Sequence, residues 1–218
     1  MTQKHTGKSV SRRQIIAPLA IGAVVSAAGG RVLAQNATTG PRLVTPQQTE
    51  GPFYPRTFPD DVDNDLANIQ GRSVAAAGGR LELAGSLRDI EGQVIDNAII
   101  EIWHCDEEGV YHHVGGANAG DENFQGFGAT LTDAQGRFHF TTILPGLYTG
   151  RTRHIHFKVK ATGFRTLTSQ LYFEQDHARN MRDGLYRRLS DAERALVTTD
   201  LNQSAAGTNS ASLPIIIA

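Results

Sequence analysis

Short apolar and β-branched runs, separated by turn residues, dominate the chain after Gly79. Runs of this kind are typical of strands, and their close succession is typical of an all-β sandwich. We therefore expect an all-β fold, namely an antiparallel β-sandwich. The predicted strands are residues 80–87, 98–103, 109–114, 127–132, 137–143, 154–160 and 166–173.

Local signals also predict two turns and one helix. Residues 89–92 and 133–136 each have Asp first and Gly fourth, which suits a type I turn between antiparallel strands. Ser190 and Glu193 have the spacing of a capping box, in which two side chains bind free N–H groups at the start of a helix. A short C-terminal helix is therefore expected from this box to about Thr199.

The first 34 residues have the composition of a cleavable export signal. Their apolar run, residues 15–28, is too short to span a bilayer, so no stable membrane anchor is expected. The segment Ser11–Ile16 resembles a twin-arginine signal, whose translocase exports folded proteins, although an ordinary secretory signal is the alternative. We expect an exported protein, periplasmic or secreted. The basic residues before the apolar run are Lys4, Lys8, Arg12 and Arg13.

Removing residues 1–34 leaves 184 residues, enough for one domain with a substantial core. Residues 35–78, rich in Thr, Pro, Asn and Gly, are expected to form an N-terminal arm beside a β-sandwich domain at 79–218. Without the signal the chain has 16 Lys and Arg against 22 Asp and Glu, and this net charge of −6 argues against nucleic acid as a partner. The single cysteine, Cys105, excludes an intramolecular disulfide and a Cys-based zinc site.

His154 and His156 are the first candidates for chemistry. Side chains alternate along a strand, so both imidazoles leave one face of the predicted strand 154–160 and could hold a metal ion. Two polar residues on a solvent-facing strand would have the same spacing.

Two tyrosines and two arginines lie near these histidines. Tyr148 is in a loop with Pro and Gly six residues before His154, and loops on rigid scaffolds commonly carry function. Tyr111 lies in an upstream segment, and either tyrosine alone is ordinarily β-sheet packing. Arg151 and Arg153 could stabilise negative charge on a bound anion, although each alone would be read as a surface ion pair.

Together these residues resemble the intradiol ring-cleavage dioxygenases, the family of catechol 1,2-dioxygenase, hydroxyquinol dioxygenase and the protocatechuate 3,4-dioxygenase subunits. Four motifs occur in the family's order between about Thr45 and Asp176. Each motif is weak alone, but four in the correct order are strong support. They are the N-terminal motif Thr49–Tyr54, the segment Gly92–Tyr111 ending in the first tyrosine ligand, the block Pro145–His156, and the downstream strand Ser169–Phe173.

The resemblance implies a non-heme Fe(3+) ion, with a solvent hydroxide as one ligand. Phenolates are hard anionic donors that suit ferric iron, and imidazoles bind metals through a neutral nitrogen. The protein ligands would be Tyr111, Tyr148, His154 and His156.

The implied reaction uses O2 to cleave a catechol-type ring between its two hydroxyl-bearing carbons. Tyr148 would also act as the base that takes a substrate proton, and Arg151 would stabilise negative charge on the substrate ring. Gln170 matches a position that supports this arginine. Hydrolysis of the resulting anhydride would give a muconate-type diacid.

Departures from the family pattern leave the preferred diol open. The usual Arg-Pro-x-His-Ile-His has Thr152 in place of the proline, and the stretch from the second tyrosine to the first histidine is shorter than in protocatechuate enzymes. The long N-terminal helical segment through which cytoplasmic catechol dioxygenases dimerise is not matched, so both a monomer and a homo-oligomer are open.

Two other protein classes compete with this interpretation. Cupins also begin their metal motif with His-x-His, but a glutamate follows where this chain has Lys158, Val159 and Lys160. A non-catalytic transthyretin-like or carbohydrate-binding β-sandwich would share the fold, but it has no reason to collect two tyrosines, two histidines and an arginine at this spacing.

Overall fold

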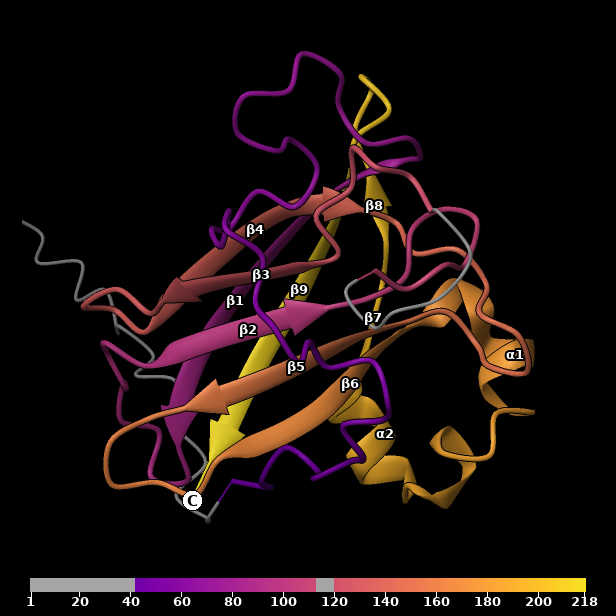
Figure 1. The fold of residues 1–218 in the computed structure, drawn as a ribbon. Coiled ribbons are helices and arrows are strands. Elements are labelled where there is room, and N and C mark those ends of the chain that lie inside the picture. Colours follow the sequence, from indigo (N-terminus) through magenta and orange to yellow (C-terminus); the bar gives the residue numbers. More distant parts are fainter. Residues whose placement is uncertain (1–41, 113–119) are drawn as a thin grey trace, which may run out of the picture. The chain divides into compact units, whose positions relative to one another are not determined.

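Two β-sheets lie face to face with an apolar core between them (Figure 1). This computed structural model describes residues 42–112 and 120–218. The strand order is β4-β1-β9-β8 in one sheet and β3-β2-β5-β6-β7 in the other, which confirms the predicted all-β sandwich. The strands are β1 (Arg80–Asp89), β2 (Ile99–Trp103), β3 (Phe127–Leu131), β4 (Arg137–Ile143), β5 (His154–Lys160), β6 (Leu167–Phe173), β7 (Thr198–Thr199), β8 (Asn202–Gln203) and β9 (Asn209–Ile217).

The helices are short and follow β6. None of those in the described part of the chain is long and apolar enough to cross a membrane. The predicted export signal, residues 1–34, lies outside the described residues. The helices are η1 (Glu174–Asp176), α1 (His177–Asn180), η2 (Tyr186–Arg188) and α2 (Asp191–Val197).

Side-chain alternation along β5 separates the core from a polar outer face. Ile155, Phe157 and Val159 are fully buried between the sheets. Burying a Val, Ile or Phe side chain stabilises the fold by about 1.5–3 kcal/mol. His154 and His156 leave the opposite face of the same strand, because successive side chains point to opposite sides of a sheet.

Six of the seven predicted strands are confirmed, but the prediction of a strand at 109–114 is wrong over its described residues, 109–112. The backbone turns there because Oδ1 of the buried Asp106 accepts the N–H groups of Glu108 and Val110, at 3.0 and 2.8 Å. Gly109 has a φ of +81°, which a β-strand does not allow.

Sequence reasoning missed β9. It pairs in parallel with β1 along Leu81–Asp89, and β7 pairs in parallel with β6, so the sheets are mixed rather than purely antiparallel. Pro214 interrupts the strand signal, yet it is tolerated because β8 pairs only with the start of β9, at Asn209 and Ser210. The sequence of β9 nevertheless has a period-two pattern of buried apolar residues, namely Ala211, Leu213, Ile215 and Ile217.

The predicted capping box is confirmed at the start of α2. Ser190 Oγ accepts the N–H of Glu193 at 3.3 Å, and the Glu193 carboxylate accepts the N–H of Ser190 at 2.8 Å. The helix ends at Val197, two residues before the expected Thr199.

Replacing Ser190 by alanine should lower the free energy of unfolding by about 1 kcal/mol, because one N–H at the helix start loses its acceptor. Urea denaturation followed by far-ultraviolet circular dichroism would measure the change. A transition midpoint equal to that of the unmodified protein would contradict a stabilising cap.

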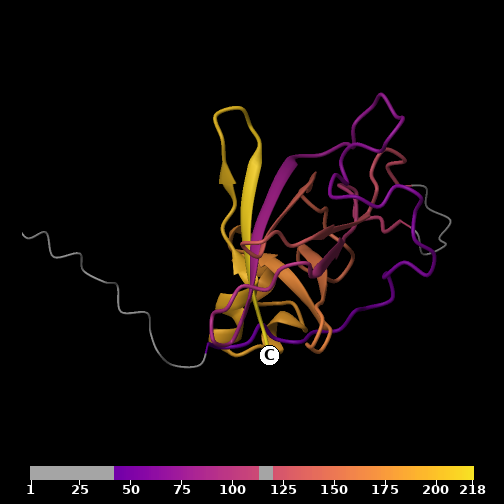
Figure 2. The same ribbon diagram turned by 90° about the vertical axis from the view of Figure 1, so that its left-hand side faces the viewer.

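The N-terminal arm, residues 42–78, ends against β4, where the N–H of Leu66 donates to the carbonyl of Thr141 at 2.9 Å and the Leu66 side chain is buried in the core. Its earlier part, to about residue 58, crosses the outer face of the five-stranded sheet (Figures 1 and 2). It is attached to β6, where the N–H of Gln48 donates to the carbonyl of Thr168 at 2.8 Å and Ser169 Oγ donates to the carbonyl of Pro46 at 2.7 Å. The arm therefore covers the face of the sheet from which the two histidines emerge.

Candidate metal centre

Strand pairing places polar and aromatic side chains in a row on the outer face of the five-stranded sheet. His156 lies opposite Trp103 of β2 and opposite Gln170 of β6, and the next row pairs His154 with Tyr172. All five residues are buried, with exposed fractions of 3% or less. The outer face is thus a buried polar site rather than a solvent-facing surface.

His154 presents one ring nitrogen as an acceptor. Nδ1 lies 2.7 Å from the carbonyl oxygen of Thr152, which can only accept, so Nδ1 carries the proton. Nε2 is then the nitrogen with a free lone pair, and it lies 3.1 Å from the hydroxyl of Tyr111. Burial, followed by the nearby Arg151 cation, lowers the pKa of His154 to about 4, so the imidazole is neutral at pH 7.

His156 is held by ring packing. Its ring stacks on the indole of Trp103 with centroids 4.8 Å apart and planes 10° apart, and it lies 4.9 Å from the ring of His154. Burial and the neighbouring His154 and Arg151 lower the pKa of His156 well below its ordinary value. Its Nδ1 is buried and has no hydrogen-bond partner among the described residues.

Two loops that pack on each other carry the two tyrosines. The N–H of Gly146 donates to the carbonyl of Asp106 at 2.8 Å, which joins the loop before Tyr148 to the loop before Tyr111. A Cβ at Gly146 would overlap the Glu107 carbonyl, and one at Gly109 would lie 2.5 Å from the Leu147 carbonyl oxygen. Only glycine allows the two backbones to approach this closely.

The tyrosine rings meet beneath the arm. Tyr111 and Tyr148 are 5.5 Å apart between centroids with planes at 80°. Phe53 of the arm stacks on Tyr111, with centroids 4.1 Å apart and planes 7° apart, and it contacts Tyr148 edge-on at 5.1 Å. The structure therefore brings Tyr111, Tyr148, His154 and His156 into one cluster. Tyr111 and His154 are in contact although they are 43 positions apart in the sequence.

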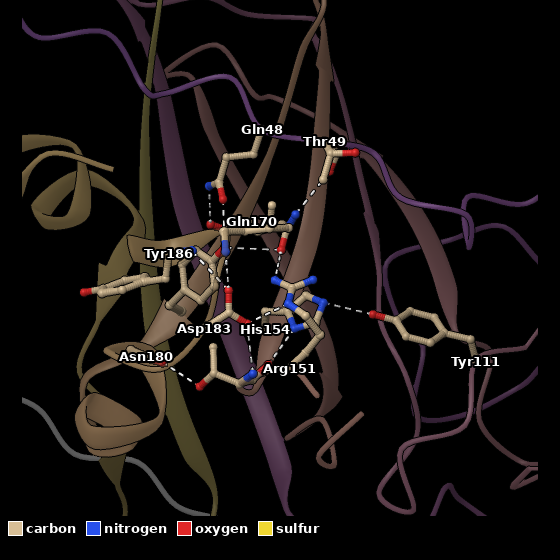
Figure 3. Close-up of polar contacts among 12 residues, drawn as sticks. Gln48, Thr49, Tyr111, Arg151, His154, Gln170, Asn180, Asp183 and Tyr186 are labelled. Atoms are coloured by element: carbon tan, nitrogen blue, oxygen red, sulfur yellow. Dashed lines mark hydrogen bonds and ion pairs between the residues drawn. The ribbon is translucent and has the colours of Figure 1, made fainter. Parts of the chain in front are cut away.

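Arg151 is fixed by two hydrogen bonds (Figure 3). Its Nε donates to Asp183 Oδ2 at 2.6 Å, and one terminal nitrogen donates to Gln170 Oε1 at 2.7 Å. Gln170 in turn donates from Nε2 to the carbonyl of Thr49 at 3.1 Å. Burial raises the pKa of Asp183, but hydrogen bonds from Arg151 and from backbone N–H groups hold it below its ordinary value.

Arg153 is held in an ion pair, the ordinary alternative considered for it from the sequence. Its Nε donates to the carbonyl of Pro145 at 2.6 Å, and its guanidinium pairs with Asp176 at 2.9 Å. It therefore ties the Tyr148 loop to η1.

Sequence reasoning missed Phe53 and Asp183 as neighbours of the site. Phe53 lies inside the N-terminal motif, so a signal existed for it. Asp183 had none, because an aspartate 32 residues after Arg151 has no local pattern that marks it as a partner.

The donor set fits a hard, highly charged metal ion. Two neutral imidazoles supply lone pairs, and removal from water raises the pKa of the Tyr111 hydroxyl, an effect strengthened by Cys105 and opposed by Arg151. Such a phenol becomes a phenolate at neutral pH when a strong positive charge lies beside it. No group of three or more His, Cys, Asp and Glu side chains in the described chain could hold a metal, so a centre here requires the tyrosines.

Comparison with known proteins identifies the family. The family model described as "Dioxygenase" matches residues 49–214. A solved structure, the dioxygenase domain of a dioxygenase carbohydrate-binding protein fusion from Streptomyces sp. SirexAA-E, is 29% identical with a TM-score of 0.63. The superposition covers 79% of this chain and 97% of that one.

Two curated relatives are ring-cleavage dioxygenases. The protocatechuate 3,4-dioxygenase beta chain of Burkholderia cepacia is 33% identical over 57% of this chain and 57% of its own length. Catechol 1,2-dioxygenase of Acinetobacter baylyi is 31% identical over 71% of this chain and 56% of its own. The chain thus spans little more than half the length of these relatives, and it belongs to the intradiol ring-cleavage dioxygenase family.

Proposed function

We propose that this chain is a ferric-iron intradiol dioxygenase that cleaves a catechol-type diol with O2 between the two hydroxyl-bearing carbons. The product would be a muconate-type diacid. The observation that carries the proposal is the single cluster of two tyrosines and two neutral histidines beside a fixed arginine. A binding module of the same fold has no need of this cluster.

Iron would be held by Tyr111, Tyr148, His154 and His156. When bound, Fe(3+) would supply the positive charge that keeps both tyrosines deprotonated and would draw the two oxygens of a diol to itself. The lone pair of His154 Nε2 already faces the Tyr111 hydroxyl at 3.1 Å, so these two donors would be available to the same ion.

The protein's own groups would then position the substrate and move its proton. The phenolate oxygen of Tyr148 would take a proton from a substrate hydroxyl, and the ring of Tyr148 is only half-buried, which leaves it open to a ligand. The Arg151 guanidinium would stabilise negative charge on the substrate ring, since Asp183 and Gln170 fix its orientation in advance.

We further propose that the protein is exported, on the twin-arginine-type signal in residues 1–34. N-terminal sequencing of the protein recovered from the cell envelope or the medium would find a start near Gln35.

An absorption spectrum is the direct test of the metal centre. Protein loaded with ferric iron should bind one iron per chain and show a broad visible tyrosinate-to-iron band. Adding catechol without oxygen should shift this band to longer wavelength, because the diol joins the iron. A colourless protein that retains no iron would instead favour the non-catalytic β-sandwich.

A further inference from the structure

A buried lysine lies two residues beyond His156 on the outer face of β5. Lys158 is 8% exposed, and its ammonium group pairs with the carboxylate of Glu50 in the arm. The same nitrogen lies 3.3 Å from the centroid of the Tyr54 ring. One cation on the sheet thus contacts two residues of the arm.

These two contacts bracket the residue that covers the first tyrosine. Phe53, which stacks on Tyr111, lies between Glu50 and Tyr54 in the chain. Gly51 lies so close to the sheet that a Cβ there would be 3.6 Å from His156 Cε1. Residues 49–54, called the strap below, therefore stack on a tyrosine of the candidate centre and pass close to one of its histidines.

A second set of contacts runs from the strap through aromatic rings. Tyr54 packs edge-on against Trp103 with centroids 5.0 Å apart, and Trp103 stacks on His156. The Lys158 ammonium lies 5.8 Å from the centroid of the indole ring.

The Lys158 ammonium depends on the strap for its stability. A buried ammonium is stable only beside an opposite charge or an aromatic face, and here the strap supplies both. The sheet residue opposite Lys158 is Glu101, but Glu101 is paired with Lys160 at 2.5 Å. Lys158 therefore pairs with Glu50 of the strap rather than with Glu101, its neighbour in the sheet.

We propose that Lys158 is a positioning residue that holds the strap closed over Tyr111 and His156. It acts through Glu50 and Tyr54, which fix the backbone on either side of Phe53. The proposal rests on the proposed function only in treating Tyr111 and His156 as iron ligands. Closure of the strap over these two residues does not require a bound metal.

Trp103 offers a direct readout, since it is the only tryptophan in the chain and is 1% exposed. In metal-free protein, acrylamide should quench its fluorescence weakly while the strap is closed. Replacing Lys158 by methionine keeps most of the side-chain volume but removes the charge, so quenching should rise severalfold. Lys158→Arg should recover much of the protection, because arginine retains the charge and packs on aromatic faces.

Lys160→Met is the comparison variant, since Lys160 lies on the same face of β5 and pairs with Glu101 of the sheet at 2.5 Å, while its hydrogen bond to the strap, to the Tyr54 hydroxyl, is long at 3.4 Å. Its loss should raise quenching much less than Lys158→Met does. If Lys158→Met does not fold, Glu50→Gln tests the same contact from the strap side, where the Glu50 side chain is 43% exposed and the fold depends less on it.

In iron-loaded protein, Lys158→Met should move the tyrosinate-to-iron band and raise KM more than it lowers kcat. Quenching equal to the unmodified protein, or an equal rise in Lys160→Met, would overturn the proposal. Because quenching is measured without metal, this failure is distinct from a failure to bind iron, which would refute the proposed function instead.

Discussion

Replacing Tyr148 by phenylalanine is expected to lower the ring-cleavage rate by about 10²- to 10⁴-fold, the usual contribution of a positioned acid or base. The change removes the proposed base and one proposed iron ligand, but it keeps the ring that packs edge-on against Phe53. The thermal unfolding midpoint should therefore stay close to that of the unmodified protein. Iron content and the visible band, measured on the same sample, should both decrease.

Tyr186→Phe is the matched control for this variant. Its hydroxyl lies 3.0 Å from Thr198 Oγ1 of β7, and the substitution keeps the ring that packs edge-on against Tyr172, so loss of the hydroxyl should leave the rate of ring cleavage unchanged. Full activity of Tyr148→Phe, with iron retained and the band unshifted, would remove Tyr148 from both proposed roles.

Replacing Gly146 by alanine is expected to destabilise the fold by about 1–3 kcal/mol or more, because the loops have no space for a methyl group. The added Cβ would overlap the Glu107 carbonyl oxygen and lie 2.7 Å from the backbone nitrogen of Gly109. Relief of this overlap requires the two loops to separate, which would move Tyr148 away from Tyr111. Iron affinity should therefore fall together with stability.

Gly184→Ala provides the comparison, since a Cβ at that position meets no heavy atom within 4 Å. Urea denaturation and iron titration of both variants would separate a general effect of alanine from the local overlap. Equal stability of the two variants would show that the Tyr148 loop does not depend on close contact at Gly146.

The sequence predicted the features that depend on a few neighbouring residues. Period-two alternation correctly placed β5, and the capping box correctly placed the start of α2. The segment 109–112 was misread because its composition resembles a strand, whereas the side chain of Asp106 binds the N–H groups of Glu108 and Val110 and turns the backbone.

The candidate site was only partly predictable. The pattern indicated which tyrosines and histidines to consider, and the structure brings these four together; their binding of iron remains a prediction. Local spacing held no information about Asp183, which fixes Arg151 from 32 residues away. Phe53 lies inside a recognised motif, but only the structure shows that its ring stacks on Tyr111.

The sequence by itself determined six of the strands, the shared face of His154 and His156, and membership of a family recognised from four motifs. Only the tertiary structure decided which distant residues complete the site, how β9 returns in parallel beside β1, and which cation holds the strap. The physical reason is that strand alternation and capping arise within a few residues, whereas these contacts depend on where the whole chain returns after many residues.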